Sequence, residues 1–70
     1  MNYNYDECVA KLIEKYWMLR ERYIKEELEE TVSSLLEDGM DINNETVLDE
    51  FNSRMEYNFR EGYFLEEITK

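Results

Sequence analysis

The stretch EDGMDINNETV, residues 37–47, places a helix stop and a helix start only a few residues apart. Gly39 suits the left-handed position just past the end of a helix. Asn43 is a favourable N-cap, and Ile42 and Val47 stand where a hydrophobic staple would fix the entering chain. A connection this short between two amphipathic helices predicts an antiparallel helical hairpin.

Apolar residues before this stretch recur at three- and four-residue steps, a spacing typical of a helix and not of a strand. With Asp6 as N-cap and Gly39 as stop, they predict one long helix over about residues 6–38, about 50 Å in length. Ser33 and Ser34 compete for backbone hydrogen bonds and could bend it. The apolar positions are Val9, Leu12, Ile13, Tyr16, Leu19, Tyr23, Ile24, Leu28, Val32, Leu35 and Leu36.

A second apolar stripe follows the connection and predicts a helix over about residues 44–61. Its members are Val47, Leu48, Phe51, Met55 and Phe59. Gly62 is expected to end this helix, and residues 63–69 would then form a last helical turn or a short third helix. Alternatively the second helix continues to Thr69, with Gly62 costing about 1 kcal/mol.

The 70 residues form a single all-α domain, 1–70, whose core is small. Cys8 is the only cysteine, so no internal disulfide is available, and His is absent, so a structural zinc is excluded. Two helices alone cannot cover both apolar stripes. We therefore expect a homodimer in which two hairpins form a helical bundle.

The aromatic residues and the thiol fit this packing. Cys8 is expected to be a small buried or half-buried apolar residue. Tyr3 and Tyr5 flank the first helix and are expected to be exposed. The remaining aromatic residues considered are expected in the core or the dimer interface: Tyr16, Trp17, Tyr23, Phe51, Phe59, Tyr63 and Phe64.

All of the net charge lies in the middle of the chain. The formal net charge is −10, and residues 26–53 hold ten acids and no Lys or Arg, while the two flanking segments cancel each other. Self-repulsion of this size weakens a compact fold, so its concentration in so short a chain indicates a use. These ten acids, which we call the acidic surface, are Glu26, Glu27, Glu29, Glu30, Glu37, Asp38, Asp41, Glu45, Asp49 and Glu50.

The acidic surface breaks two local rules of helix stability. Glu26 and Glu30 stand one turn apart with like charge. Glu37 and Asp38 lie at the C-terminal end of the predicted first helix, where the helix dipole disfavours anions. Such violations tend to mark functional sites, which favours a binding surface over a face that serves solubility alone.

No combination of residues predicts catalysis or metal binding. His is absent, the serines lack a base and Cys8 lacks a His partner, so we expect no enzyme. A calcium loop starting at Asp41 would need Gly and Glu where Thr46 and Asn52 stand. We therefore expect no metal and no cofactor.

Membranes and nucleic acids are disfavoured as direct partners. No apolar run approaches the ~20 residues that a membrane span needs. The negative charge would repel anionic lipid headgroups and nucleic-acid phosphates. The single thiol and the lack of an N-terminal apolar stretch favour a cytoplasmic location.

The acidic surface has the charge spacing of a nucleic-acid backbone. Carboxylates one helical turn apart are separated by about 5–6 Å, which is comparable to the phosphate spacing along a DNA strand. On a hairpin these acids gather around the turn end of a rod, and a dimer carries the set twice. Such a surface fits the phosphate-binding site of a basic DNA-binding protein.

In size and composition the whole chain resembles the small, acidic, tyrosine- and asparagine-rich proteins that phages encode to shut down host functions. The resemblance rests on the acids from Glu26 to Glu50 and on the opening Met1-Asn2-Tyr3-Asn4-Tyr5. Several of these proteins are DNA mimics, including inhibitors of HU-type nucleoid proteins. The resemblance implies an inhibitor that blocks the DNA site of a basic host protein in the bacterial cytoplasm.

A second hypothesis comes from a different class of protein. The chain could be a helical adaptor that binds its partner through an apolar groove, with the acids serving only solubility. Salt separates the two hypotheses, because a mimic should lose affinity steeply as salt rises and groove binding should change little.

Overall fold

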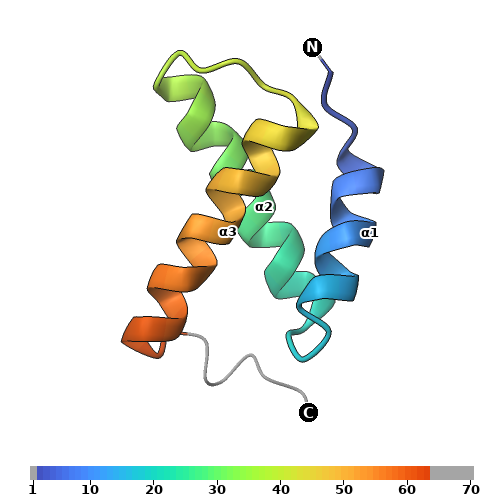
Figure 1. Ribbon diagram of the computed structural model, residues 1–70, viewed down its shortest axis with the longest axis vertical. Coiled ribbons are helices and arrows are strands. Elements are labelled where there is room, and N and C mark those ends of the chain that lie inside the picture. The colour runs from blue at the N-terminus through green and yellow to red at the C-terminus, as the bar shows by residue number, and fades with distance from the viewer. Residues whose placement is uncertain (1, 64–70) are drawn as a thin grey trace.

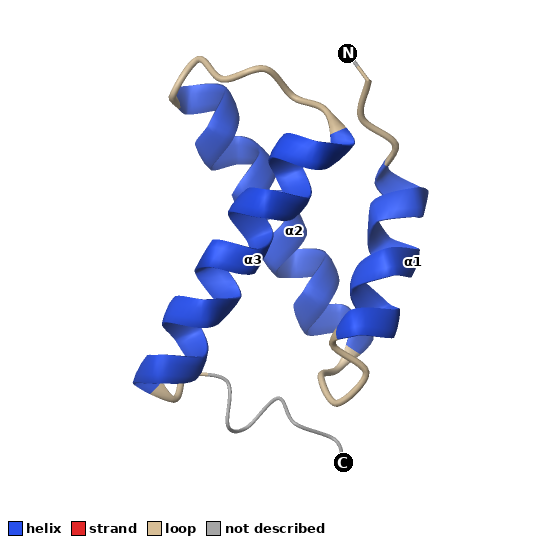
Figure 2. Cartoon of the chain, viewed as in Figure 1, coloured by secondary structure: helices blue, strands red, loops and turns tan. Residues whose placement is uncertain are grey.

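The computed structural model describes residues 2–63 and contains three helices. They are α1 (Tyr5–Lys15), α2 (Glu21–Glu37) and α3 (Asn44–Glu61). Figure 1 shows α2 and α3 crossing each other, with α1 beside them. The cartoon in Figure 2 has no strand within the described range, so the all-α prediction is confirmed.

The predicted helix over residues 6–38 is wrong, because two helices and a tight turn replace it. α1 ends at Lys15, residues 16–20 turn, and α2 begins at Glu21. The Leu19 N–H donates to the Tyr16 carbonyl oxygen at 2.9 Å, and both side chains are buried. The apolar spacing runs through this turn without interruption, so periodicity alone does not reveal it.

The first N-cap also differs from the prediction. The Oδ1 atom of Asn4 accepts a hydrogen bond from the Glu7 N–H at 2.9 Å, so Asn4 caps α1 and Asp6 lies in its first turn. An acid in the first turn interacts favourably with the helix dipole without being the cap. Further along the chain, α2 is helical throughout Ser33 and Ser34.

The helix stop in residues 37–47 forms as predicted. Gly39 has a φ of +73°, the left-handed conformation that glycine adopts at little cost. Its N–H donates to the Leu36 carbonyl at 3.1 Å, and the Met40 N–H donates to the Leu35 carbonyl at 3.0 Å. This pair of bonds is a Schellman motif, which satisfies carbonyls that the helix end leaves free.

The helix start in the same stretch is also confirmed. The Oδ1 atom of Asn43 accepts the Thr46 N–H at 2.8 Å, so Asn43 is the N-cap of α3. Ile42 and Val47 are both buried, as a hydrophobic staple requires.

The C-terminal end of α3 matches the predicted boundary. Gly62 has a φ of +72°, and the Tyr63 N–H donates to the Asn58 carbonyl at 3.0 Å, which ends the helix. The alternative in which this helix continues to Thr69 is therefore wrong. The short helix predicted over residues 63–69 lies outside the described residues apart from Tyr63, which is in a turn.

The chain before α1 is tied to the start of α3 through Asn44. The Asn44 N–H donates to the Asn2 carbonyl at 3.2 Å. The Oδ1 atom of Asn44 accepts hydrogen bonds from the Asn4 N–H at 2.7 Å and from the Cys8 thiol at 3.4 Å. These contacts place the N-terminal segment beside the α2–α3 connection (Figure 1).

All three helices contribute to one core. Cys8 is fully buried, as expected of a small apolar residue. Because α1 folds back onto α2, the single chain covers much of both apolar stripes, which removes one reason for expecting a dimer; the dimer stays a prediction. The buried apolar residues are Cys8, Val9, Leu12, Tyr16, Leu19, Ile24, Leu28, Leu35, Ile42, Val47, Phe51 and Met55.

The aromatic residues divide between the core and the surface. Tyr16 and Phe51 are buried, with ring centroids 5.8 Å apart, and Tyr23 packs against the core. Tyr3 also packs against the core, so its predicted exposure is wrong, whereas Tyr5 is exposed. Three residues expected in the core or a dimer interface are exposed on the single chain, namely Trp17, Phe59 and Tyr63; Phe64 lies outside the described residues.

Within residues 2–63, no helix combines the length and apolar character needed to cross a bilayer.

A hydrogen bond between the 16–20 turn and α3 provides a test of this fold. The Tyr16 hydroxyl donates to Asn52 Oδ1 at 2.6 Å. We expect a double-mutant cycle of Tyr16→Phe and Asn52→Ala in urea to give a coupling of about 0.5–1.5 kcal/mol. The exposed Tyr5→Phe should change the free energy of unfolding little. A coupling near zero would contradict the docking of this turn onto α3.

Candidate functional site

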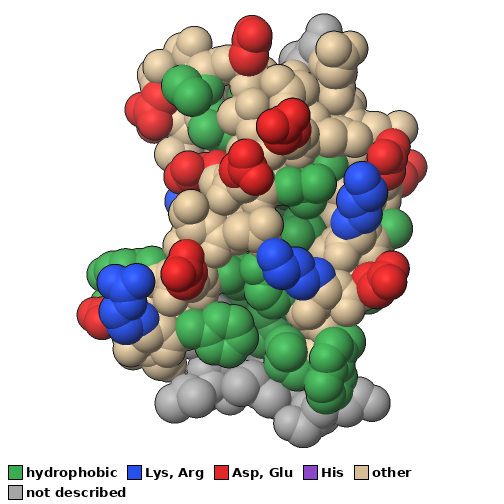
Figure 3. All heavy atoms as spheres, in the orientation of Figure 1, with side chains coloured by type: hydrophobic (Ala, Val, Ile, Leu, Met, Phe, Trp, Pro, Cys, Tyr) green, Lys and Arg blue, Asp and Glu red, His purple; other side chains and the backbone are tan. Residues whose placement is uncertain are grey.

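The acidic surface spans α2, the connection after it and the first half of α3. Glu27 and Glu50 are half-buried, and the other eight acids are exposed. Figure 3 shows acidic side chains spread over the upper part of the molecule, where the α2–α3 connection lies. By their positions in the chain, Glu37, Asp38, Asp41 and Glu45 lie at or beside this connection, Asp49 and Glu50 lie in the first half of α3, and Glu26, Glu27, Glu29 and Glu30 lie toward the start and middle of α2.

The acids do not form two parallel rows. α2 and α3 cross, so the end of α2 and the start of α3 lie apart and residues 38–43 bridge them (Figure 1). Carboxylates at the turn end are consequently distributed over a broad surface rather than along a single ridge.

Within residues 2–63, three of the ten acids have a basic partner. Glu26 lies 3.9 Å from Arg22 on the same helix, an exposed pair. Arg54 Nη2 lies 3.3 Å from Glu27 Oε2 and 3.2 Å from Glu30 Oε2. Among residues 2–63, the other seven have no ion pair: Glu29, Glu37, Asp38, Asp41, Glu45, Asp49 and Glu50.

Arg54 is the site residue that sequence reasoning missed. It is the first base after the acidic window, and α3 carries it back against α2. The Glu27 side chain is 16% exposed and that of Arg54 is 30% exposed, so this pair is shielded from water more than the surface pairs are. The sequence gives no signal for the contact, because the register of α3 on α2 decides which acids Arg54 meets.

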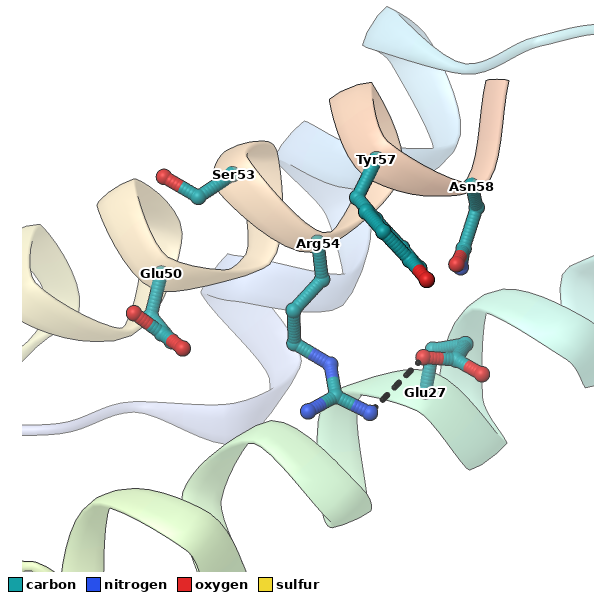
Figure 4. A pocket seen from close by; sticks show the side chains of 6 residues that line it. All are labelled: Glu27, Glu50, Ser53, Arg54, Tyr57 and Asn58. Atoms are coloured by element: carbon teal, nitrogen blue, oxygen red, sulfur yellow. Dashed lines mark hydrogen bonds and ion pairs between the residues drawn. The ribbon is translucent and has the colours of Figure 1, made fainter. Parts of the chain in front are cut away.

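A groove of about 370 Å³ lies around this ion pair. Figure 4 shows Arg54 reaching from α3 toward Glu27 on α2. The Nε atom of Arg54 is buried and has no hydrogen-bond partner within the described part of the chain. The side chains that line the groove are Glu27, Glu50, Ser53, Arg54, Tyr57 and Asn58.

The conflict between the acidic surface and the helix dipole is present in the structure. The last turns of α1 and α3 each contain a base, Lys15 and Arg60 respectively. The last turn of α2 contains none and ends in Glu37 and Asp38. Negative charge at this end raises the local electrostatic energy, and a cationic partner would lower it.

Two titratable groups outside the acidic surface, Cys8 and Tyr3, have raised pKa values. Burial raises the pKa of the Cys8 thiol, which disfavours the nucleophilic thiolate. Burial is also the main reason that the pKa of Tyr3 rises to about 12. No group of three or more Cys, Asp or Glu side chains in residues 2–63 could hold a metal ion.

No family model, curated protein or solved structure matches the chain.

The ion pair in the groove has a measurable role in stability. We expect Arg54→Gln to lower the free energy of unfolding by about 1–3 kcal/mol, because it leaves the half-buried Glu27 carboxylate without a cation. Arg22→Gln removes an exposed pair and should change it by less than about 0.5 kcal/mol. Urea unfolding measures both variants, and equal losses would contradict a special role for Arg54.

Proposed function

We propose that this protein is an acidic inhibitor that binds a basic DNA-binding protein and blocks its DNA site. An HU-type nucleoid protein of a bacterial host is the favoured target. The observation that carries the proposal is a set of seven acids on α2, α3 and the connection between them that have no ion pair within residues 2–63. Ordinary helix surfaces mix charges of both signs, as α1 does here.

The magnitude of the charge supports a DNA-like role. The molecule is 35 Å long and carries a net charge of −10. A duplex of that length carries about 20 charges, since there is one charge per about 1.7 Å of axis. One chain thus supplies about half the charge of the duplex it would replace, and two copies supply all of it.

A homodimer is part of this proposal for that reason. We expect sedimentation equilibrium at moderate salt to give twice the chain mass of 8.6 kDa. Phe59 and Tyr63, aromatic side chains exposed near the C-terminal end of α3, are candidates for the interface. A mass of one chain at all accessible concentrations would rule the dimer out.

The test of the inhibitor proposal is displacement of DNA. In fluorescence anisotropy, the protein should release a labelled duplex from an HU-type nucleoid protein. Its affinity should fall by at least ~10-fold between about 50 mM and about 200 mM salt. Changing Glu29, Glu37, Asp38 and Asp41 to the corresponding amides should abolish displacement, because no cation in the described part of the chain pairs with these acids.

The control variant removes the same number of charges elsewhere. Amide substitutions at the exposed acids Glu14, Glu21, Glu56 and Glu61 should leave most of the displacement intact. Equal effects of the two variants would mean that net charge alone matters. Affinity that does not depend on salt would instead favour an adaptor that binds through apolar contacts.

A further inference from the structure

Two large apolar side chains are exposed among the acids at the C-terminal end of α2. Leu36, in the last turn of α2, is 57% exposed, and Met40, just after the helix, is 51% exposed. Figure 3 shows hydrophobic surface over the end of α2, with acidic side chains on either side of it. We call these two residues the apolar patch.

The apolar patch does not belong to the core of this chain. Leu35 is buried, whereas its neighbour Leu36 points away from the core despite being part of the same predicted stripe. Holding a leucine and a methionine in water is unfavourable, and a Lys or Glu at either position would serve solubility better.

The backbone holds the apolar patch in a fixed arrangement. The Gly39 N–H bonds to the carbonyl of Leu36, and the Met40 N–H bonds to the carbonyl of Leu35. The Schellman motif therefore orders the segment that carries both side chains. A surface ordered before binding loses less conformational entropy when it binds.

The surroundings of the apolar patch define its partner by charge. Glu37, Asp38 and Asp41 are its neighbours in the chain, and none of them has an ion pair within residues 2–63. The C-terminal end of the α2 dipole adds further negative potential. An apolar centre with a charged rim is the usual anatomy of a protein–protein interface.

We infer that Leu36 and Met40 are the anchor of the acidic surface and enter an apolar depression beside the cationic DNA site of the target protein. This inference rests on the proposed function and extends it. DNA phosphates offer no equivalent of these side chains, so the target would be recognised by apolar contact as well as by charge. A second copy of this chain is a poor occupant, because it would bring Glu37, Asp38 and Asp41 of two chains together.

The test uses the double variant Leu36→Gln, Met40→Gln and an HU-type nucleoid protein with labelled duplex. We expect the double variant to need at least ~10-fold more protein than the unmodified chain to displace the duplex, at both low and moderate salt. A few buried side chains carry most of the affinity of an interface, so their loss should weaken binding this much. The slope of affinity against salt should not change, because no charge is removed. Removal of the acids should instead reduce that slope.

The matched control is Trp17→Gln, which removes an apolar side chain that is 61% exposed at the turn between α1 and α2. It should leave displacement unchanged, and circular dichroism should show the same helix content in all variants. If the double variant displaces DNA as well as the unmodified chain does, this inference is overturned and the proposed function stands. If the unmodified chain displaces no DNA, both are overturned.

Sedimentation equilibrium tests whether a second copy of this chain, rather than the target protein, covers the apolar patch. The double variant should have the same mass as the unmodified chain. A dimer of the unmodified chain that the double substitution converts to a monomer would show that the apolar patch is a self-interface, and would overturn the inference.

Discussion

Burial of Tyr16 and Leu19 at the turn between α1 and α2 is the constraint on which the fold depends. A straight helix through these residues would leave one long apolar stripe facing a single partner helix. The turn divides the stripe, and α1 then packs against the helix that follows it. A chain of 70 residues obtains a three-helix core in this way, without a disulfide.

The sequence predicts the helix stops at Gly39 and Gly62 and the N-cap at Asn43, but it predicts the packing of distant segments poorly. Gly39, Asn43 and Gly62 act through their own backbone or through neighbours three residues away, so their roles and the bounds of α3 follow from residue type. The turn at Tyr16 has no glycine, proline or polar cap to mark it, and tertiary burial decides it. The acidic surface was predictable as a set of residues, whereas its broad distribution depends on the crossing of α2 and α3.

Arg54 shows why a count of charges along the chain differs from the charge that a partner meets. Arg54 lies outside residues 26–53 in the sequence, yet in the fold it forms ion pairs with Glu27 and Glu30 and offsets part of their negative charge. Of the acids without an ion pair in residues 2–63, Glu37, Asp38 and Asp41 lie at the C-terminal end of α2 or just after it, where the dipole of α2 adds to their negative charge. Among residues 2–63, the acids without an ion pair are thus seven of the ten that the sequence window contains.

The bonds from Asn44 to Asn2 and Asn4 have a consequence for handling the protein. They hold the first residues at the same end of the molecule as the α2–α3 connection. Any segment fused before Asn2 would therefore stand next to the acidic region, and a cationic tag placed there would fold onto it and compete with a partner. For a labelled or immobilised form of this protein, the position of the attachment would thus decide whether the acidic end remains accessible.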